Sequence, residues 1–463
     1  MDLALLIPPS PRKNNIIRMI DCSHEAKANY LWQPNDFMII TSLLKPEDRV
    51  ALIDGTADKL NDSDYLHAVQ AVPADLIIVA LSSVCWAADY QAFQKVRRLK
   101  QGIPLFVIGD IFLDGSYRKL ILEQCDGIIF NPYLLDLDAM RRVRTGPGIA
   151  VLPGVATRPD APVSLEGKGP ILLSDTRPPR HEVFLKSGYR FPFAHHYRFS
   201  TVTTVWGCPF SCSYCSDANF PAVVRQAEDV MRELDILAGL GVRELFIADK
   251  VFGFSRRNAD RLLTAMAERH RFGWSCYFHP QLYDPVLLDL MRRAGCHTII
   301  TGIDSADVAS LVRYGRRVEA ERIDRLLTHA GRIGISVCAD FILGLEHESE
   351  EDVIRTIRFA LEKPIDFASF NIAAPLPGSG IRQRAISEGK LVFGAEGFDT
   401  CGRMGVMGND RISPERLREI RKWAFRRFYL RPSYWLRRLR MTRSVEHFLI
   451  QAGEMLSMLR KYA

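Results

Sequence analysis

The sequence contains no apolar run long enough to cross a membrane, because a helical span needs about 20 consecutive apolar residues. Residues 1–10 hold one short apolar run, with neither the basic start nor the small-residue cleavage site of a secretory leader. The hydrophobic fraction of 47% and the charged fraction of 25% show no bias toward a disordered chain. We therefore expect a folded, soluble protein in the cytoplasm.

Disulfide bonds are not expected, because the reducing cytoplasm rarely supports them. The chain has ten cysteines, of which only three stand at the spacing of metal ligands. The G-x-G-x-x-G fingerprint of dinucleotide-binding folds is also absent. The cysteines are therefore interpreted as buried thiols or as ligands of a metal cluster.

Positive charge exceeds negative charge by 7 and is concentrated near the end of the chain. Residues 411–443 hold a dense series of arginines interleaved with aromatic side chains; it includes Arg426, Arg427, Arg437, Arg438 and Arg440. This pattern is typical of a solvated helix face, of a contact with an anionic substrate, or of peripheral contact with a membrane. No recognised nucleic-acid-binding motif accompanies the charge, so we expect no nucleic-acid partner.

The length of 463 residues predicts two core domains followed by a tail. In residues 1–135, short apolar runs alternate with segments of helical length, which is the pattern of an α/β fold with a doubly wound parallel sheet. The predicted strands are 3–7, 50–53, 76–81, 105–108 and 128–130, and the predicted helices are 36–44, 65–72, 90–99 and 117–125. Residues 136–194 are rich in proline and glycine and predict a linker.

A second alternating series covers residues 195–385. Its predicted strands are 199–205, 244–248, 274–278, 298–302, 337–343 and 367–373. Asp284 before Pro285 predicts a helix start, and Ser349 with Asp352 resembles a capping box. Repeated strand–helix units of this length predict a partial (βα)6 TIM-type barrel, whose chemistry would lie at the C-terminal ends of its strands. A helical tail is expected over residues 386–463.

Cys208, Cys212 and Cys215 form a C-x3-C-x2-C run on the loop that follows the first strand of this second series. Three thiolates within eight residues can hold one face of a cubane iron–sulfur cluster and leave one iron without a protein ligand. A structural zinc site is an alternative, although zinc usually takes four ligands and no second Cys or His pair stands nearby. Chance clustering of buried cysteines is the other alternative.

This run resembles the signature of the radical S-adenosylmethionine (radical SAM) superfamily, in which an aromatic residue commonly precedes the last cysteine, as Tyr214 does here. The resemblance implies that the three cysteines hold a 4Fe-4S cluster. Its open iron would bind S-adenosylmethionine, and an electron from the cluster would then cleave that cofactor to a 5'-deoxyadenosyl radical. A low-potential electron donor, such as a ferredoxin or a flavodoxin, is therefore an expected partner.

The resemblance continues along residues 199–380 and implies further cofactor contacts near the strand ends. It places Asp249 at the methionine end of S-adenosylmethionine, and the stretch from Gly302 to Ser305 resembles the Gly-Ile-Glu-Ser of many members. The expected cofactor-binding residues are Tyr214, Asp249, Asp304, Ser305, Gly344, Glu346 and Pro377. His279, at the end of the third strand, is the candidate catalytic residue, with a structural role as the alternative.

An N-terminal doubly wound domain before such a barrel resembles the cobalamin-binding subgroup, which includes C-methylases and the anaerobic porphyrin-ring cyclase. The matching stretches are residues 52–54, 74–79 and 104–109, whereas the D-x-H-x-x-G motif that supplies a cobalt ligand is missing. The resemblance implies cobalamin as a further cofactor and methyl transfer to an unactivated carbon of a large apolar substrate, such as a tetrapyrrole or a polycyclic lipid. The alternatives are radical oxidation, cyclisation or rearrangement of such a substrate, a non-enzymatic cobalamin or redox sensor, and a zinc hydrolase.

Overall fold

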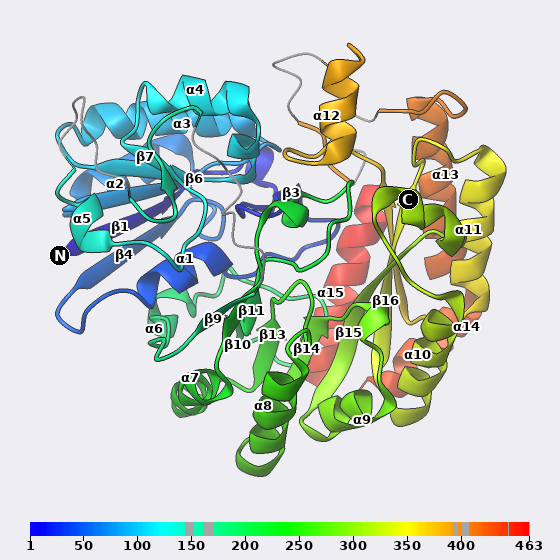
Figure 1. Ribbon diagram of the computed structural model, residues 1–463. Coiled ribbons are helices and arrows are strands. Elements are labelled where there is room, and N and C mark those ends of the chain that lie inside the picture. Colours follow the sequence, from blue (N-terminus) through cyan, green and yellow to red (C-terminus); the bar gives the residue numbers. More distant parts are fainter. Residues whose placement is uncertain (144–151, 161–169, 392–396, 401–406, 443, 463) are drawn as a thin grey trace.

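The computed structural model describes residues 1–143, 152–160, 170–391, 397–400, 407–442 and 444–462. Two α/β units lie side by side, each built around its own parallel sheet, and the C-terminal helices pack along the second unit (Figure 1). The N-terminal unit is blue to cyan in this view, and the second unit is green to yellow. This arrangement confirms the predicted order of a doubly wound domain, a partial barrel and a helical tail.

The first sheet is parallel except for its last strand. Within the described residues its strand order is β4-β1-β5-β6-β7-β8, with β1 at Asp2–Ile7, β4 at Arg49–Asp54, β5 at Leu76–Ala80, β6 at Leu105–Ile108, β7 at Gly127–Ile129 and β8 at Val155–Ala156. The parallel part follows the order second, first, third, fourth, fifth, which is a doubly wound arrangement. The winding direction reverses between β1 and β5, and folds of this kind bind ligands at the C-terminal edge of that point.

The helices of the first unit agree with the predicted crossovers. They are α1 (Asn35–Thr41), α2 (Asp62–Ala71), α3 (Trp86–Leu99) and α4 (Gly115–Leu122). Asn61 caps α2 by accepting a hydrogen bond from the Asp64 N–H, and Asp114 caps α4 in the same way from the Ser116 N–H. Strands β5 and β6 are buried on both faces, as the centre of a sheet covered by helices on two sides requires.

The predicted linker is partly built into both units. Strand β8 pairs antiparallel with β7 of the first sheet. Strand β9 (Ile171–Leu173) pairs with β12 (Val223–Arg225), which also pairs with β11 (Val205–Trp206) just before the cysteine run. Two short helices, α5 (Leu137–Met140) and α6 (His181–Phe184), belong to the same stretch. These pieces are too short to produce a periodic pattern, which explains why the sequence indicated only a linker.

The second sheet is entirely parallel in the described part of the chain, and its strands lie in sequence order. They are β10 (Phe199–Val202), β13 (Glu244–Ile247), β14 (Gly273–Tyr277), β15 (Cys296–Asp304), β16 (Ser336–Leu343) and β17 (Phe367–Ile372). Each strand lies where the sequence predicted it. Because all of these strands run in one direction, the residues that follow them gather at one end of the sheet, above which the cysteine run lies.

Helices cover the outer face of this sheet (Figure 1). They are α7 (Ala227–Gly239), α8 (Arg256–Arg269), α9 (Pro285–Arg293), α10 (Ala320–Ile333) and α11 (Glu350–Glu362). The Asp284 side chain caps α9, and Ser349 and Asp352 form the predicted capping box at the start of α11. Both helix starts predicted from the sequence are thus confirmed.

The C-terminal region is helical, as predicted, in its described residues. It comprises α12 (Gly380–Ser387), α13 (Pro414–Tyr429), α14 (Pro432–Met441) and α15 (Val445–Tyr462). Helix α13 covers β17 with Leu417, Ala424 and Phe428, which are fully buried. No helix in the part of the chain that the structure describes is both long enough and apolar enough to span a membrane.

Residues 8–34, the segment between β1 and α1, leave the first unit and enter the second. This connecting segment contains η1 (Pro11–Lys13) and the short strands β2 (Ile16–Ile17) and β3 (His24–Glu25). Trp32 packs against Phe246 of β13 and belongs to an apolar cluster with Ile300 of β15. The Gln33 amide donates a hydrogen bond to the Phe199 carbonyl of β10. The connecting segment therefore occupies space on the inner face of the second sheet.

Candidate functional site

The cysteine run begins at a sharp turn after β11. Gly207 has φ of +76°, and a Cβ at this position would lie 2.2 Å from the Pro221 carbonyl oxygen. Only glycine fits such a close approach, and the turn places Cys208 beyond the end of the strand. The Cys208 N–H donates to the Phe220 carbonyl at 3.2 Å, and the Cys215 N–H donates to the Cys212 carbonyl at 3.0 Å. These bonds fold the run into a compact loop.

Two other parts of the barrel hold this loop in place. The Ser213 N–H donates to the carbonyl of Tyr314, in η5 (Val308–Tyr314), and the Ser213 carbonyl accepts from Ile381 of α12. The Ser216 hydroxyl donates to the Pro377 carbonyl at 2.8 Å. Pro377, an expected cofactor-binding residue, therefore lies directly against the cysteine loop. A loop anchored on both sides can keep three sulfurs in a fixed relation.

Burial controls the protonation of the three thiols. It raises the pKa of Cys208 to about 12 and the pKa of Cys215 well above its usual value, and it also raises the pKa of Cys212. Thiolates at this place therefore need a bound cation, and iron supplies that charge in an iron–sulfur cluster. The donor set thus fits the expected cluster.

The three cysteine sulfurs are not all as close together as a single zinc ion would hold them. Among the described residues, the trios whose ligand atoms all lie within 4.8 Å of one another do not include Cys208, Cys212 and Cys215. A single zinc ion, with Zn–S bonds of about 2.3 Å, would hold three sulfurs closer than that. The wider spacing agrees with the cluster interpretation.

Tyr214 and Asp304, both expected to bind cofactor, meet next to the cysteine loop. The Tyr214 hydroxyl donates to Asp304 Oδ2 at 2.8 Å. Asp304 ends β15 with φ of +64°, an uncommon conformation for a residue with a side chain, and it forms an ion pair with Arg316. The positive charge of Arg316 also acts on Cys212, where it opposes the effect of burial on the thiol pKa. Sequence reasoning missed Arg316, because one arginine after a helix carries no recognisable signal.

His279 lies where the sequence placed it, at the end of β14 beside the cysteine loop. Its ring stacks on Phe210 of the loop, with ring centroids 4.2 Å apart. Burial, together with the charge of the Arg316 guanidinium, lowers the pKa of His279 to about 3. The Arg316 Nη1 atom is 2.8 Å from His279 Nε2. The ring is therefore neutral at physiological pH, and its catalytic role stays a prediction.

Ser305 and Gly344 meet at a buried carboxylate that the sequence did not single out. Glu348 accepts from the Ser305 hydroxyl at 3.0 Å and from the backbone N–H groups of Gly344 and Leu345. In contrast, Glu346 is exposed and pairs with Arg384 of α12 at 3.1 Å. The stretch after β16 is therefore anchored by Glu348, while the carboxylate of Glu346 lies at the surface.

Asp249, which follows β13, is fully buried. Its carboxylate binds the backbone segment that leads to the cysteines. It accepts hydrogen bonds from the backbone N–H and the hydroxyl of Thr204. Burial raises the pKa of Asp249 to about 6, and the Thr204 bonds lower it. The contact with S-adenosylmethionine implied by the resemblance stays a prediction for this residue.

Lys250 forms a charged cluster beside the cysteines that sequence reasoning also missed. Its ammonium lies 2.9 Å from Asp21 of the connecting segment and 3.9 Å from Asp217. Burial would lower the pKa of Lys250, but the two carboxylates raise it well above its usual value. Cys22, also in the connecting segment, is close enough to influence the pKa of Cys215. Part of the N-terminal unit therefore belongs to the site.

The first sheet also reaches the cysteine end of the barrel with its C-terminal edge. A Cβ on Gly378, which follows Pro377, would lie 2.9 Å from Leu113 of η2 (Asp110–Leu113) and 2.7 Å from Asn219. Asp114, which caps α4, forms a buried ion pair with Arg382 of α12 at 3.0 Å. The edge of the first sheet that would bind a ligand thus faces the cysteine loop.

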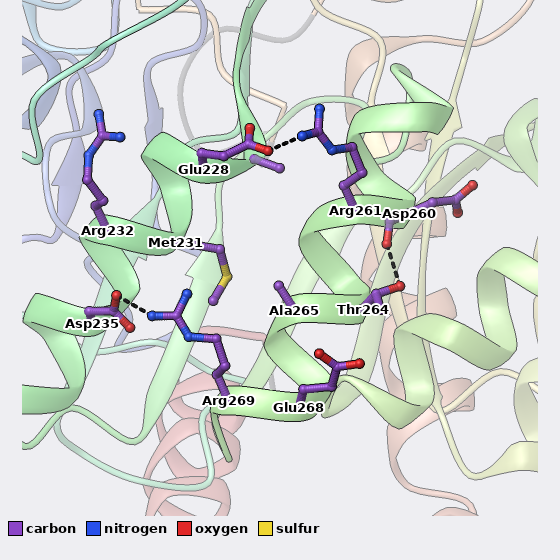
Figure 2. A pocket seen from close by; sticks show the side chains of 11 residues that line it. Glu228, Met231, Arg232, Asp235, Asp260, Arg261, Thr264, Ala265, Glu268 and Arg269 are labelled. Atoms are coloured by element: carbon purple, nitrogen blue, oxygen red, sulfur yellow. Dashed lines mark hydrogen bonds and ion pairs between the residues drawn. The ribbon is translucent and has the colours of Figure 1, made fainter.

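A surface hollow of about 730 Å³ lies elsewhere, between α7 and α8 (Figure 2). Charged pairs line it: Glu228 faces Arg261, and Asp235 accepts from Arg269 at 2.6 Å. Both helices belong to the outer layer of the barrel. This hollow contains none of the predicted site residues.

Comparison with known proteins agrees with the geometry. Residues 202–360 match the Radical SAM superfamily. An uncharacterised methyltransferase of Pyrococcus horikoshii is 25% identical over 447 residues, which cover 93% of each chain. The anaerobic magnesium-protoporphyrin IX monomethyl ester cyclase of Rubrivivax gelatinosus is 26% identical over 49% of this chain and 42% of its own.

A solved structure shares the fold of both units. The radical S-adenosylmethionine methyltransferase TsrM from Kitasatospora setae, with cobalamin and a 4Fe-4S cluster bound, superposes with a TM-score of 0.64. The superposition covers 84% of this chain and 78% of TsrM at 16% identity. Residues 202–360 thus form a radical SAM domain, and the chain is a radical SAM enzyme that uses a 4Fe-4S cluster and S-adenosylmethionine.

Proposed function

We propose that this enzyme transfers a methyl group to an unactivated carbon, with cobalamin as the methyl carrier. The observation that carries the proposal is the joining of a cysteine-ligated radical SAM site to a doubly wound unit whose ligand-binding edge faces it. The Pyrococcus relative, which matches over nearly the whole chain, is named a methyltransferase. TsrM, which shares the fold, is a methyltransferase with cobalamin bound.

The chain's own residues have separable tasks in this proposal. Cys208, Cys212 and Cys215 hold the cluster, which when bound supplies the electron that cleaves S-adenosylmethionine to a radical. Tyr214, Asp304 and Arg316 form a hydrogen-bonded network beside the loop. Its fixed charges can orient the amino and carboxylate groups of S-adenosylmethionine, because Asp304 is negatively charged and Arg316 is positively charged.

At the edge of the first sheet, the connecting segment packs closely against the ends of the strands. Arg18 of the connecting segment crosses this edge and pairs with buried Asp89 at 2.8 Å. A Cβ on Gly55 would lie 2.6 Å from the Pro9 nitrogen, and one on Gly109 would lie 2.0 Å from the Leu81 carbonyl oxygen, so these glycines serve close backbone packing. We therefore assign no residue a role in binding cobalamin. The experiment below compares samples with and without it.

We infer that the substrate is large and apolar, such as a tetrapyrrole or a polycyclic lipid. Support comes from the cyclase relative, whose name gives a magnesium porphyrin as its substrate. The electron donor would be a ferredoxin or a flavodoxin, because cleavage of S-adenosylmethionine needs one low-potential electron for each radical. Both inferences rest on the assignment of residues 202–360 as a radical SAM domain.

The test uses S-adenosylmethionine labelled with a trideuterated methyl group and needs no knowledge of the substrate. The protein is reconstituted anaerobically with iron and sulfide and incubated with dithionite, with and without hydroxocobalamin. We expect S-adenosylhomocysteine to form only with cobalamin present, and an equal amount of label to be recovered with the corrinoid. The 5'-deoxyadenosine should appear in both samples.

Other outcomes identify the alternatives. Formation of 5'-deoxyadenosine without S-adenosylhomocysteine, and without any cobalamin effect, would reject methyl transfer. It would favour oxidation, cyclisation or rearrangement, for which the match to the cyclase is the supporting observation. Formation of neither product by a preparation with a full cluster would contradict the proposal.

A further inference from the structure

Two histidines and a glutamate meet at the end of the barrel opposite to the cysteines. Glu244 begins β13, His297 stands at the start of β15, and His195 precedes β10. One ligand atom from each residue lies within 4.8 Å of the other two. This cluster lies at the N-terminal ends of the strands, whereas the chemistry of such barrels occupies the C-terminal ends.

Two of the three residues are buried. Glu244 has no exposed surface, and His297 is 4% exposed, whereas His195 is partly buried. A carboxylate enclosed in this way is costly without a compensating partner, which a bound cation can supply.

The outer partner of His297 directs one of its ring nitrogens at Glu244. His297 Nδ1 is 2.9 Å from the Thr298 hydroxyl, which leaves Nε2 directed at Glu244 Oε1 at 2.7 Å. The other carboxylate oxygen accepts from the His195 backbone N–H at 3.1 Å. Metal-bound imidazoles usually have their second ring nitrogen held in this manner, because the outer bond fixes the tautomer and the ring orientation.

Ring contacts link His195 to two other histidines. The His195 ring stacks on His297 with ring centroids 3.9 Å apart. His447 of α15, which is 3% exposed, has its ring centroid 4.2 Å from that of His195. Imidazoles beside a carboxylate are a donor set that a divalent cation can occupy.

We propose that His195, Glu244 and His297 bind a zinc ion. Two imidazoles with one carboxylate form a common zinc donor set, whereas a site without cysteine does not suit an iron–sulfur cluster. The ion joins the segment before β10 to the starts of β13 and β15. An ion at the end of the barrel opposite to the cysteine loop would have a structural role, because the chemistry of such barrels occupies the other end.

The test measures bound zinc in a variant in which Cys208, Cys212 and Cys215 are all replaced by Ala, so that zinc cannot occupy the cluster loop. After incubation with zinc sulfate and gel filtration, elemental analysis should find about one zinc per chain. Adding His297→Gln or Glu244→Gln should lower zinc by about tenfold or more, because each change removes one ligand. The control is His270→Gln, at a histidine that pairs with Asp235 outside the cluster.

His195→Gln provides a second variant if the buried changes prevent folding, because His195 is only partly buried. Circular dichroism verifies that each protein tested is folded. Replacement of zinc by Co²⁺ should give visible ligand-field absorption, which the ligand variants lose and the His270 control retains. Zinc well below one per chain in the triple-Ala variant, or unchanged zinc in the folded ligand variants, would overturn the proposal.

Discussion

Glu348 illustrates at the residue scale how a buried carboxylate organises the stretch after β16. It accepts hydrogen bonds from Ser305, Gly344 and Leu345, and it is 1% exposed. Burial raises its pKa from 4.5 to about 7, and the hydrogen bonds only partly offset this effect. The folded protein therefore holds a proton on Glu348 at pH values where the unfolded chain has lost it.

This shift predicts a pH dependence of stability. Below pH 4.5 Glu348 is protonated in both states, so its contribution to stability is fully present there. As the pH rises toward 7, that contribution is lost, by about 3 kcal/mol in total for a shift of about 2.5 pKa units. Glu348→Gln, which cannot ionise, should weaken the fall in stability between pH 5 and pH 7.5.

Urea unfolding at the two pH values checks this prediction. Asp249 and Glu244 also have raised pKa values, so the parent protein should lose stability over the same range for more than one reason. The difference between the parent and the Gln variant isolates Glu348. An identical pH dependence in both proteins would show that Glu348 is ionised in the folded state near pH 5.

The site residues differ in whether a short stretch of sequence is enough to predict them. A short motif indicated the cysteine loop and Tyr214, and the resemblance to Gly-Ile-Glu-Ser indicated Asp304. The structure brings Tyr214 and Asp304 into hydrogen-bond contact, and their contact with a cofactor stays a prediction. Arg316 and Lys250 were not predictable, since each acts through partners distant in sequence. Glu346 and Glu348 are two residues apart, and only packing decides which of them is buried.

At the scale of elements, the two sheets were predictable and the connections were not. The parallel strands of both units are mainly apolar runs of three to nine residues, which form a recognisable pattern between helical segments. The connecting segment has no such pattern, because its side chains are polar where they meet β10 and aromatic where they meet β13. Its position depends on the docking of one unit on the other.

The arginine-rich helices differ in how their charges are used. In α14, Arg437 pairs with Asp366 at 2.9 Å, and the Arg438 guanidinium lies 4.4 Å from the centroid of the Phe367 ring. In α13, Arg426 and Arg427 are exposed. Large apolar side chains are exposed on the same region, namely Trp423, Leu430, Trp435, Leu436, Leu439, Phe448 and Leu449. Exposed arginines beside apolar side chains favour contact with an anionic membrane.

Joint replacement of Arg426 and Arg427 by Gln should therefore weaken binding to anionic phosphatidylserine vesicles. A loss of about 1 kcal/mol for each arginine corresponds to about thirtyfold lower partitioning. Salt should weaken the binding of the parent protein as well. Joint replacement of Arg437 and Arg438 serves as the comparison, and it should lower thermal stability more than binding. Equal vesicle sedimentation of the parent and the Arg426/Arg427 variant would favour a solvated helix face.

For the whole molecule, the two units share one site rather than standing apart. The connecting segment brings Asp21 and Cys22 to the cysteine loop, and η2 brings Leu113 to Gly378. Both sheets present the C-terminal ends of their parallel strands to this interface, which is where each fold type binds its ligands.

The cluster is the part of the account on which all the chemistry depends. Each of the three thiolates holds one iron, and water is a poor substitute for a thiolate ligand.

The most direct measurement is therefore of iron, sulfide and 5'-deoxyadenosine in anaerobically reconstituted protein and in the single variants Cys208→Ala, Cys212→Ala and Cys215→Ala. Cys296→Ala, at a buried cysteine of β15, is the matched control. The parent and the control should contain about four irons per chain and produce 5'-deoxyadenosine with dithionite and S-adenosylmethionine, whereas each loop variant should lose both. Full iron content and unchanged 5'-deoxyadenosine formation in any one of the loop variants would contradict the account.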